Sequence, residues 1–350
     1  MLNLTPYLED IERRIDPQEE QSIYDAWCTF AHGRNTLSPF QPPIRTPKPS
    51  SLKWTHVNVN DALQDEDLMI LSQLERCHTG LSRPTDSPII MRANYGVGNI
   101  SRMFGARPFV MPYQADTQPN VYPIGDGADG IRRLLDEKEP DINSGNNEHI
   151  WHIAERFAEI GRKYPKIGRY IRIDHPDGQG PMDNCELLWG SDLFCDLYDE
   201  PELVHAFLRR LTDTIRRFYD KWYSILPKPD EMVSYFGKMA LGGVVLRDDS
   251  AMNMSPEFFD EFIAPYDADL LTHFGGGIVH FCGRGDHFVS RLAALPGLNA
   301  VDMSQPHLNN MDIILSALVD QGINLFCPRG SYSLECHNLT RLNAYGRSNY

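Results

Sequence analysis

The alternation of apolar runs with amphipathic helical segments predicts a parallel α/β fold, and we favour a (β/α)8 TIM-type barrel. Polar residues stand at the ends of the predicted strands: Asn94, Asp174, Arg247, Asp248, His280, Cys282, Asp302 and Cys327. In such a barrel, the C-terminal strand ends form the active-site rim, whereas a doubly wound sheet usually offers fewer contributing strands. The sequence has no Gly-x-x-x-x-Gly-Lys-Ser/Thr loop, so a nucleotide site of this type, common in doubly wound folds, is not supported.

Composition and charge narrow the classes of function. The chain has 350 residues, with 33 Lys and Arg against 48 Asp and Glu, and a net charge of −15. It lacks the basic footprint of a nucleic-acid-binding protein, and an anionic membrane surface would repel it. Its seven scattered cysteines are not typical of a disulfide framework. No signal peptide or run of membrane-spanning length is visible, so we expect a cytoplasmic protein.

The N-terminal part, residues 1–50, is predicted to be a helical extension and a proline-rich connector, and residues 51–350 the barrel. Leu8, Ile11 and Ile15 recur at three- and four-residue spacing, which is typical of a helix. Prolines crowd residues 38–51 and indicate an extended segment.

The barrel elements are then expected in alternation. A helix at 61–77 is predicted between strands at 54–59 and 88–94, and a long loop at 112–130. The remaining predicted strands are 169–174, 244–246, 278–282, 299–303 and 323–327. The remaining predicted helices are 149–163, 201–222 with one clear apolar stripe, and a segment that begins at 255. The last strand is expected to be missing or altered, unless 54–59 supplies the eighth.

The segment Gly275-Gly-Gly-Ile-Val-His-Phe-Cys-Gly283 carries the strongest chemical signal. If 278–282 is a strand, its period of two places His280 and Cys282 on the same face. An imidazole beside a thiol is half of a zinc site or half of a nucleophile–base pair. The alternative is structural, with a hydrogen-bonded rim histidine and a cysteine that packs as a small apolar residue.

Carboxylates at the ends of predicted strands are the next candidates for catalytic residues. Asp174, Asp248 and Asp302 can act as general acids or bases or hydrogen-bond a substrate, although aspartates at such positions also commonly cap the following helix or loop. The predicted substrate-binding residues are Asn94, Tyr95, Gln179, Asp183 and Arg247.

Several segments, taken together and in order, resemble the uroporphyrinogen decarboxylase superfamily over roughly residues 85–330. They are Asp177-Gly-Gln-Gly-Pro-Met-Asp183, Trp189-Gly-Ser-Asp-Leu-Phe194, Leu197-Tyr-Asp-Glu-Pro-Glu-Leu-Val204, Asp249-Ser-Ala-Met-Asn-Met-Ser-Pro-Glu-Phe-Phe259, His280-Phe-Cys-Gly283 and Leu298-Asn-Ala-Val-Asp302. The resemblance implies a (β/α)8 barrel. Members of this superfamily include tetrapyrrole decarboxylases and zinc methyltransferases that act with corrinoid proteins.

The chain resembles the methyltransferase branch more closely than true uroporphyrinogen decarboxylases. The latter carry an Arg-Gln-Ala-Gly-Arg stretch whose arginines bind substrate carboxylates. This chain has no such stretch, and Arg92 and Arg102 are the nearest basic residues in the early barrel. The methyltransferase branch implies zinc held by a His-x-Cys pair, matched by His280 and Cys282, and by a later cysteine. Cys327 is our candidate by position, and Cys336 is the other choice.

Three hypotheses follow. The first is a zinc-dependent methyltransferase that moves a methyl group between a small-molecule substrate and a corrinoid on a partner protein, with a homodimer left open. The second is a metal-free decarboxylase acting on a tetrapyrrole or another carboxylate, with the aspartates carrying the acid–base work. The third is a non-catalytic barrel that binds a ligand or a partner.

Overall fold

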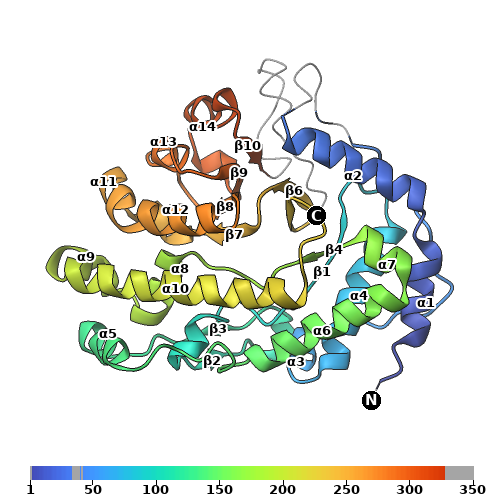
Figure 1. The fold of residues 1–350 in the computed structure, drawn as a ribbon, viewed down its shortest axis with the longest axis horizontal. Helices are drawn as coiled ribbons and strands as arrows, with labels where there is room; N and C mark the ends of the chain where they lie inside the picture. The colour runs from blue at the N-terminus through green and yellow to red at the C-terminus, as the bar shows by residue number, and fades with distance from the viewer. Residues whose placement is uncertain (1, 34–39, 41, 328–350) are drawn as a thin grey trace.

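Parallel strands form the centre of the molecule, which we describe from a computed structural model of residues 2–33, 40 and 42–327 (Figure 1). Strands β1 (Ile89–Arg92) and β4 (Ile171–Asp174) form one parallel pair. A four-stranded parallel sheet has the order β10-β9-β8-β7, with bounds β7 (Val244–Arg247), β8 (Gly277–Phe281), β9 (Leu298–Met303) and β10 (Asn324–Phe326).

A parallel bridge between Gln179 and Arg247 joins these two sheets beyond the end of β4. The parallel strands therefore follow one another as β1, β4, β7, β8, β9 and β10. This confirms the predicted α/β class with parallel sheets. Within the described ranges no pairing connects β10 to β1, so the closed barrel is not shown. The expected altered last strand falls on residues after 327, outside the described part.

Strands β5 (Met232–Tyr235) and β6 (Lys238–Leu241) form an antiparallel hairpin that the sequence analysis did not predict. Its two turn residues, Phe236 and Gly237, have φ values of 47° and 76°. Two central residues with positive φ are typical of the type I′ turn, whose twist suits a two-residue hairpin. A short antiparallel pair, β2 (Pro108–Phe109) and β3 (Asn120–Val121), lies in the predicted long loop.

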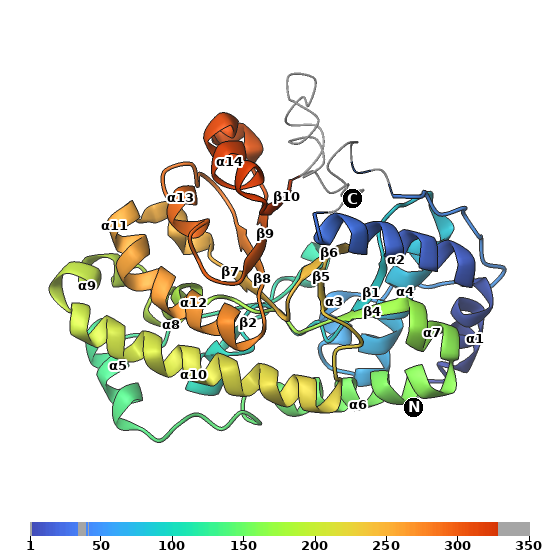
Figure 2. The same cartoon turned by 45° about the horizontal axis from the view of Figure 1, so that its top comes forward.

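The four-stranded sheet is covered on both faces. Figure 2 shows helices α12, α13 and α14 on one side of it and the hairpin β5–β6 on the other. Successive side chains along each strand point to opposite faces of the sheet, because the side-chain period of a strand is two residues. The residues that pack with the hairpin and α2 are Val245, Ile278, Ala300 and Phe326. The residues that pack in the larger cluster on the other face are Val244, Leu246, Val279, Val301 and Leu325.

The N-terminal helices α1 (Thr5–Arg14) and α2 (Pro17–Ala31) belong to the same cores. Asp16 caps the N-terminus of α2, because its carboxylate accepts hydrogen bonds from the first-turn amides. Trp27 is fully buried on α2, with ring centroids 4.7 Å from Phe40 and 6.1 Å from Phe326. Helix α2 therefore covers the inner face of the sheet.

The other helices surround the sheets, and the predicted helices around 149–163 and 201–222 are confirmed. Their bounds are α3 (Val59–Ala62), α4 (Glu66–Ser82), α5 (Gly127–Asp136), α6 (Asn147–Lys163), α7 (Pro165–Tyr170), α8 (Pro181–Trp189), α9 (Leu193–Asp199), α10 (Pro201–Ile225), α11 (Pro256–Phe258), α12 (Ala264–His273), α13 (Val289–Leu292) and α14 (Met311–Ala317). Among the described helices, none has the length and apolar composition needed to cross a membrane.

The predicted strand at 54–59 was wrong. Trp54 lies 4.9 Å from the ring of Tyr7 and stacks on His78 at 4.7 Å, so this segment runs over helices α1 and α4. Asn58 then caps α3 through its side chain. Because the segment pairs with no described strand, it does not supply an eighth strand.

The segment Gly125-Asp-Gly-Ala-Asp-Gly130 has the spacing Gly-x-Gly-x-x-Gly and overlaps the start of α5. A dinucleotide-binding loop with this spacing follows a parallel strand of a βαβ unit. The preceding strand here is the two-residue antiparallel β3, so this context does not support a dinucleotide site.

Candidate metal centre

Three potential metal ligands meet at the C-terminal ends of β7 and β8. The ligand atoms of Asp249, His280 and Cys282 all lie within 4.8 Å of one another. Cys282 Sγ is 3.4 Å from His280 Nε2, which is 3.6 Å from Asp249 Oδ1. Asp249 also accepts a hydrogen bond of 2.8 Å from the backbone N–H of Cys282, which fixes the carboxylate against the strand end.

Strand register explains why these side chains meet. Arg247 on β7 pairs with His280 on β8, and His280 pairs with Asp302 on β9. All three face the same side of the sheet because they occupy equivalent positions in parallel, in-register strands. Cys282 follows β8 two residues after His280, and Asp249 follows β7 two residues after Arg247.

The second ring nitrogen of His280 is held by Asp302. His280 Nδ1 lies 2.8 Å from Asp302 Oδ2, and the Lys238 ammonium donates a hydrogen bond of 2.5 Å to Asp302 Oδ1. A carboxylate on the far nitrogen is the usual support of a metal-binding histidine, because it orients the ring and raises its basicity. Nε2 is thereby directed toward Cys282 and Asp249.

His280 and Asp302 each stabilise the charged form of the other. Burial by itself lowers the pKa of His280, but its hydrogen bonds to Asp302 and Cys282 outweigh burial and raise this pKa to about 9. Burial raises the pKa of Asp302, yet Lys238 and His280 bring it down to about 2. Asp302 is therefore a carboxylate between two cations. A metal ion would take the place of the His280 proton on Nε2.

Cys327, predicted as the third ligand, is outside this group. It follows β10 and packs with Leu325 in the cluster on the outer side of the sheet, whereas Phe326 faces inward. Burial raises the pKa of the Cys327 thiol, which disfavours the thiolate that a metal needs. Among the described residues, Asp249 completes the group instead. Cys336 lies outside the described ranges.

A second set of charges lines the rim beside the metal ligands. Arg92 and Arg247 each place a guanidinium nitrogen 3.3 Å from Asp177 Oδ2. Gln179 donates a hydrogen bond of 3.0 Å to the other oxygen of Asp177, and Arg92 donates one of 2.7 Å to Asn94. Two cations thus share one carboxylate, so this part of the rim can accept an anionic group of a substrate.

The loop after β4 depends on two glycines. A Cβ on Gly180 would lie 2.2 Å from Asp248 Oδ1, and one on Gly178 would lie 1.8 Å from the Tyr219 hydroxyl. Only glycine allows the backbone to approach so closely, and this approach lets the Gly180 N–H donate a hydrogen bond of 2.7 Å to the Arg247 carbonyl. The glycines therefore bring Asp177 and Gln179 beside Arg247.

A cavity of about 400 Å³ opens next to these groups. Asp249 from the metal group and Arg247 from the charged rim both line it. Its other lining residues include Val97, Asn120, Gln179, Asp183, Glu186 and Ser250. This volume lies within the range typical of small-molecule sites.

Asp183 and Asp248 lie behind the rim. Asp183 accepts hydrogen bonds from the Asp249 and Ser250 amides and from the Ser250 hydroxyl, at 3.0, 2.8 and 2.6 Å, so it holds the turn that presents Asp249. Asp248 is 1% exposed, and the carboxyl group of Asp267 on α12 lies close enough to influence its charge. Burial, together with the nearby carboxylates, raises the pKa of both Asp183 and Asp248.

The other predicted residues have structural contacts. The Asp174 carboxylate accepts hydrogen bonds from the Ser234 hydroxyl and from the Phe236 N–H, the latter at 3.2 Å, and so anchors the hairpin. The ring of the buried Tyr95 stacks on His149 at 6.2 Å, over the outer helix α6.

Sequence reasoning missed four residues of the site: Arg92 and Asp177 as an ion pair, Lys238, and Asp249. Asp249 directly follows the predicted Asp248, and the alternation of the strand ending at Arg247 could have selected it as the residue on the Arg247 face. Lys238 lies on the unpredicted hairpin, so nothing in the spacing marked it.

Comparisons with known proteins give no family assignment. No protein-family model matches the chain, and no curated protein matches it significantly.

Proposed function

We propose that the chain is a zinc-dependent methyltransferase of the uroporphyrinogen decarboxylase type, built on a (β/α)8 barrel and acting with a corrinoid on a partner protein. The observation that carries the proposal is the convergence of Asp249, His280 and Cys282, with Asp302 behind the histidine. A histidine, a thiolate and a carboxylate are all established zinc ligands, and three protein ligands leave the fourth position open for a substrate. The sequence resemblance to the methyltransferase branch supports the same reading.

Zinc in such a site would lower the pKa of a substrate thiol, which makes the sulfur a nucleophile toward a methyl group. The side chains of the site supply the remaining functions. Asp302 and Lys238 keep His280 Nε2 turned toward the open side. Arg247 and Gln179 line the cavity and can hold a carboxylate or another polar group of the substrate, which fixes the sulfur near the ligands.

The transfer balances as a simple displacement. In the proposed reaction, the bond between the methyl carbon and the corrinoid cobalt would break and leave its electron pair on cobalt, while the substrate sulfur would form the new bond to carbon. The thiol proton would pass to solvent when the substrate binds. No oxidant or reductant is consumed.

The test uses the purified full chain with methylcobalamin and a small thiol such as 2-mercaptoethanol. We expect about one zinc per chain and a thiol-dependent loss of the methylcobalamin absorbance. Both should disappear in Cys282→Ser and His280→Ala and persist in Cys195→Ser, which changes an exposed cysteine on α9. A folded protein that binds no zinc, or a turnover that Cys282→Ser leaves unchanged, would overturn the proposal.

A metal-free decarboxylase is the second candidate, and the pairing of Arg92 and Arg247 on Asp177 favours it. Two guanidinium groups at one rim position suit a substrate carboxylate. Decarboxylation of uroporphyrinogen that survives chelation and is lost in Arg247→Gln would select this function over methyl transfer.

A further inference from the structure

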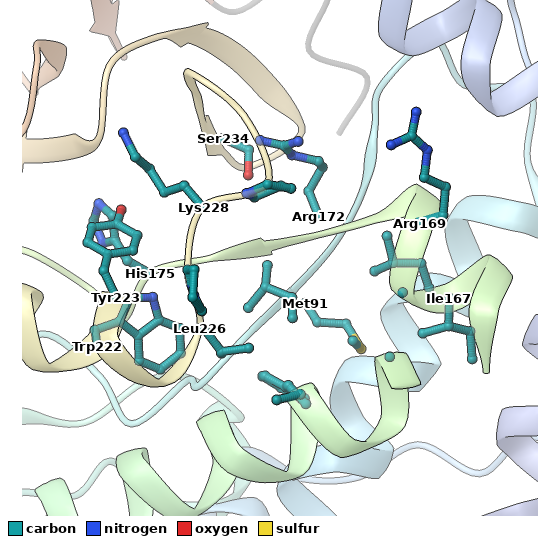
Figure 3. A pocket seen from close by; sticks show the side chains of 18 of the residues that line it. Met91, Ile167, Arg169, Arg172, His175, Trp222, Tyr223, Leu226, Lys228 and Ser234 are labelled. Atoms are coloured by element: carbon teal, nitrogen blue, oxygen red, sulfur yellow. The ribbon is translucent and has the colours of Figure 1, made fainter. Parts of the chain in front are cut away.

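A second cavity lies between strand β4 and helices α6 and α10, and it contains none of the metal ligands (Figure 3). Its volume is about 290 Å³. We propose that this cavity is a binding site for a small amphipathic carboxylate, with the apolar part between β4 and α6 and the carboxylate among the cations at its edge. This proposal is independent of the proposed methyl transfer.

The body of the cavity is apolar. The apolar residues that line it include Met91, Phe157, Ile167, Ile171, Trp222, Leu226 and Met232. Ile173, in the middle of β4, is only half-buried because its side chain borders this space. A central strand residue left partly uncovered indicates a real gap in the packing, since protein interiors are normally close-packed.

The charged residues that line the cavity are arginines and a lysine. Arg162, Arg169, Arg172 and Lys228 line it, and in the described part of the chain no aspartate or glutamate does. In Figure 3 the charged ends of Lys228, Arg172 and Arg169 extend to the upper side of the cavity, whereas Met91, Leu226 and Trp222 lie below them. This concentration of positive charge stands out in a chain whose net charge is −15.

Most of that charge has no protein counter-ion. Arg172 is neutralised by Asp230, at 2.5 and 3.0 Å. Arg169 contacts the neutral amide of Gln21 at 3.4 Å, and Lys228 contacts the Gly242 carbonyl at 3.3 Å. Arg162, Arg169 and Lys228 make no ion pair with any carboxylate of the described residues. Burial also lowers the pKa of Lys228, and the charge of the nearby Asp230 offsets this only in part.

The size of the cavity limits the ligand. At roughly 30 Å³ for each non-hydrogen atom, the share that a water molecule takes in liquid, the space holds about ten such atoms. An eight-carbon carboxylate such as octanoate, or a phenyl-substituted short acid, has this size.

Isothermal titration of the purified chain with octanoate tests the site, with octan-1-ol and acetate as comparison ligands. We expect saturable binding of octanoate, with octan-1-ol weaker by about tenfold, because it lacks the charge. Acetate should show no saturable binding because it lacks the apolar part.

Variants then locate the site. Ala158→Trp should fill the cavity and abolish octanoate binding, and Lys228→Gln and Arg169→Gln should together weaken it by about tenfold or more. Lys163→Gln, an exposed position on α6 outside the cavity lining, should bind like the parent. Circular dichroism checks that each variant is folded.

Absence of binding to the folded parent, equal affinity for octan-1-ol, or undiminished binding by folded Ala158→Trp would each overturn the proposal. Loss of zinc in Cys282→Ser would leave octanoate binding intact, which separates this test from that of the proposed function.

Discussion

The Nδ1 atom of His280 lies 2.8 Å from Oδ2 of Asp302, on the neighbouring strand of the same sheet. This contact determines which ring nitrogen is available to a metal. It also places a full negative charge behind the ring, since Lys238 and His280 keep the pKa of Asp302 at about 2 despite its burial. The candidate metal centre therefore has a carboxylate–histidine support of the kind found behind metal ligands.

Asp302→Asn should weaken zinc binding without removing a ligand. The amide keeps the shape of the side chain but loses the charge that raises the basicity of His280, so we expect zinc affinity to fall by about 10- to 100-fold. Competition with a chromophoric chelator measures the change. Asp269→Asn, on the exposed side of α12, is the matched control, and an equal affinity in both variants would contradict the role of Asp302.

The identity of the third ligand can be read from cobalt-substituted protein. The structure predicts that Asp249→Ala loses Co²⁺ affinity, because Asp249 belongs to the converging group. Cys327→Ser should leave the thiolate-to-cobalt charge-transfer band unchanged, since Cys327 packs on the outer face of the sheet, and Cys282→Ser should abolish the band. A reduced band in Cys327→Ser would mean that this cysteine reaches the metal after all.

The buried carboxyl pair of Asp248 and Asp267 should make stability depend on pH. Burial raises the pKa of Asp267 from an ordinary 3.8 to about 7, and the neighbouring Asp248 offsets part of that rise. Between about pH 4 and 7 the folded protein therefore keeps a proton that the unfolded chain has released, so this group makes the free energy of unfolding fall as pH rises.

Asp267→Asn removes that titration. The free energy of unfolding of the variant, relative to the parent, should rise between pH 4.5 and 7 by up to about 1.4 kcal/mol per pH unit. Urea unfolding across this range measures the difference, with Asp269→Asn as the exposed control. Parallel pH profiles for Asp267→Asn and the parent would show that the pair does not hold the extra proton.

Trp27 should be among the most costly positions to truncate. It is fully buried where α2 meets the inner face of the sheet, against Phe40 and Phe326. Trp27→Ala is expected to lower the free energy of unfolding by about 3–5 kcal/mol through lost burial and the cavity it leaves. Trp54→Ala, at a half-buried ring that stacks on His78, should cost clearly less. Equal losses in urea unfolding would contradict the central place of α2.

Local periodicity was sufficient for one half of the candidate site. The alternation of β8 predicts that His280 and Cys282 share a face, and the structure confirms that they lie together. The same rule applied to the last described strand says that Leu325 and Cys327 share a face, but not which one. Because Phe326 is the residue that points inward, Cys327 points outward. That choice depends on register with β9, which the sequence does not specify locally.

The remainder of the site depends on long-range packing. Lys238 reaches Asp302 from a hairpin whose turn has Phe236 at positive φ, a position where a bulky residue gives no turn signal. Asp177 meets Arg92 and Arg247 only when three separate strands are assembled. The short segment at 54–59 had strand-like composition, yet it lies on outer helices because Trp54 stacks there.

The hairpin contact through Lys238 has a thermodynamic consequence. The hairpin residues pack in the same cluster as Trp27 and Phe326, while Lys238 donates a hydrogen bond to Asp302, the carboxylate that holds His280. An ion held by His280 would therefore bind the folded chain and not the unfolded one. By mass action, an ion at a hundredfold excess over its dissociation constant would add about 2.7 kcal/mol to the free energy of unfolding. Chelation of the ion and truncation of α2 would then both lower the free energy of unfolding. A variant with a weakened core would therefore need the bound ion in order to stay folded.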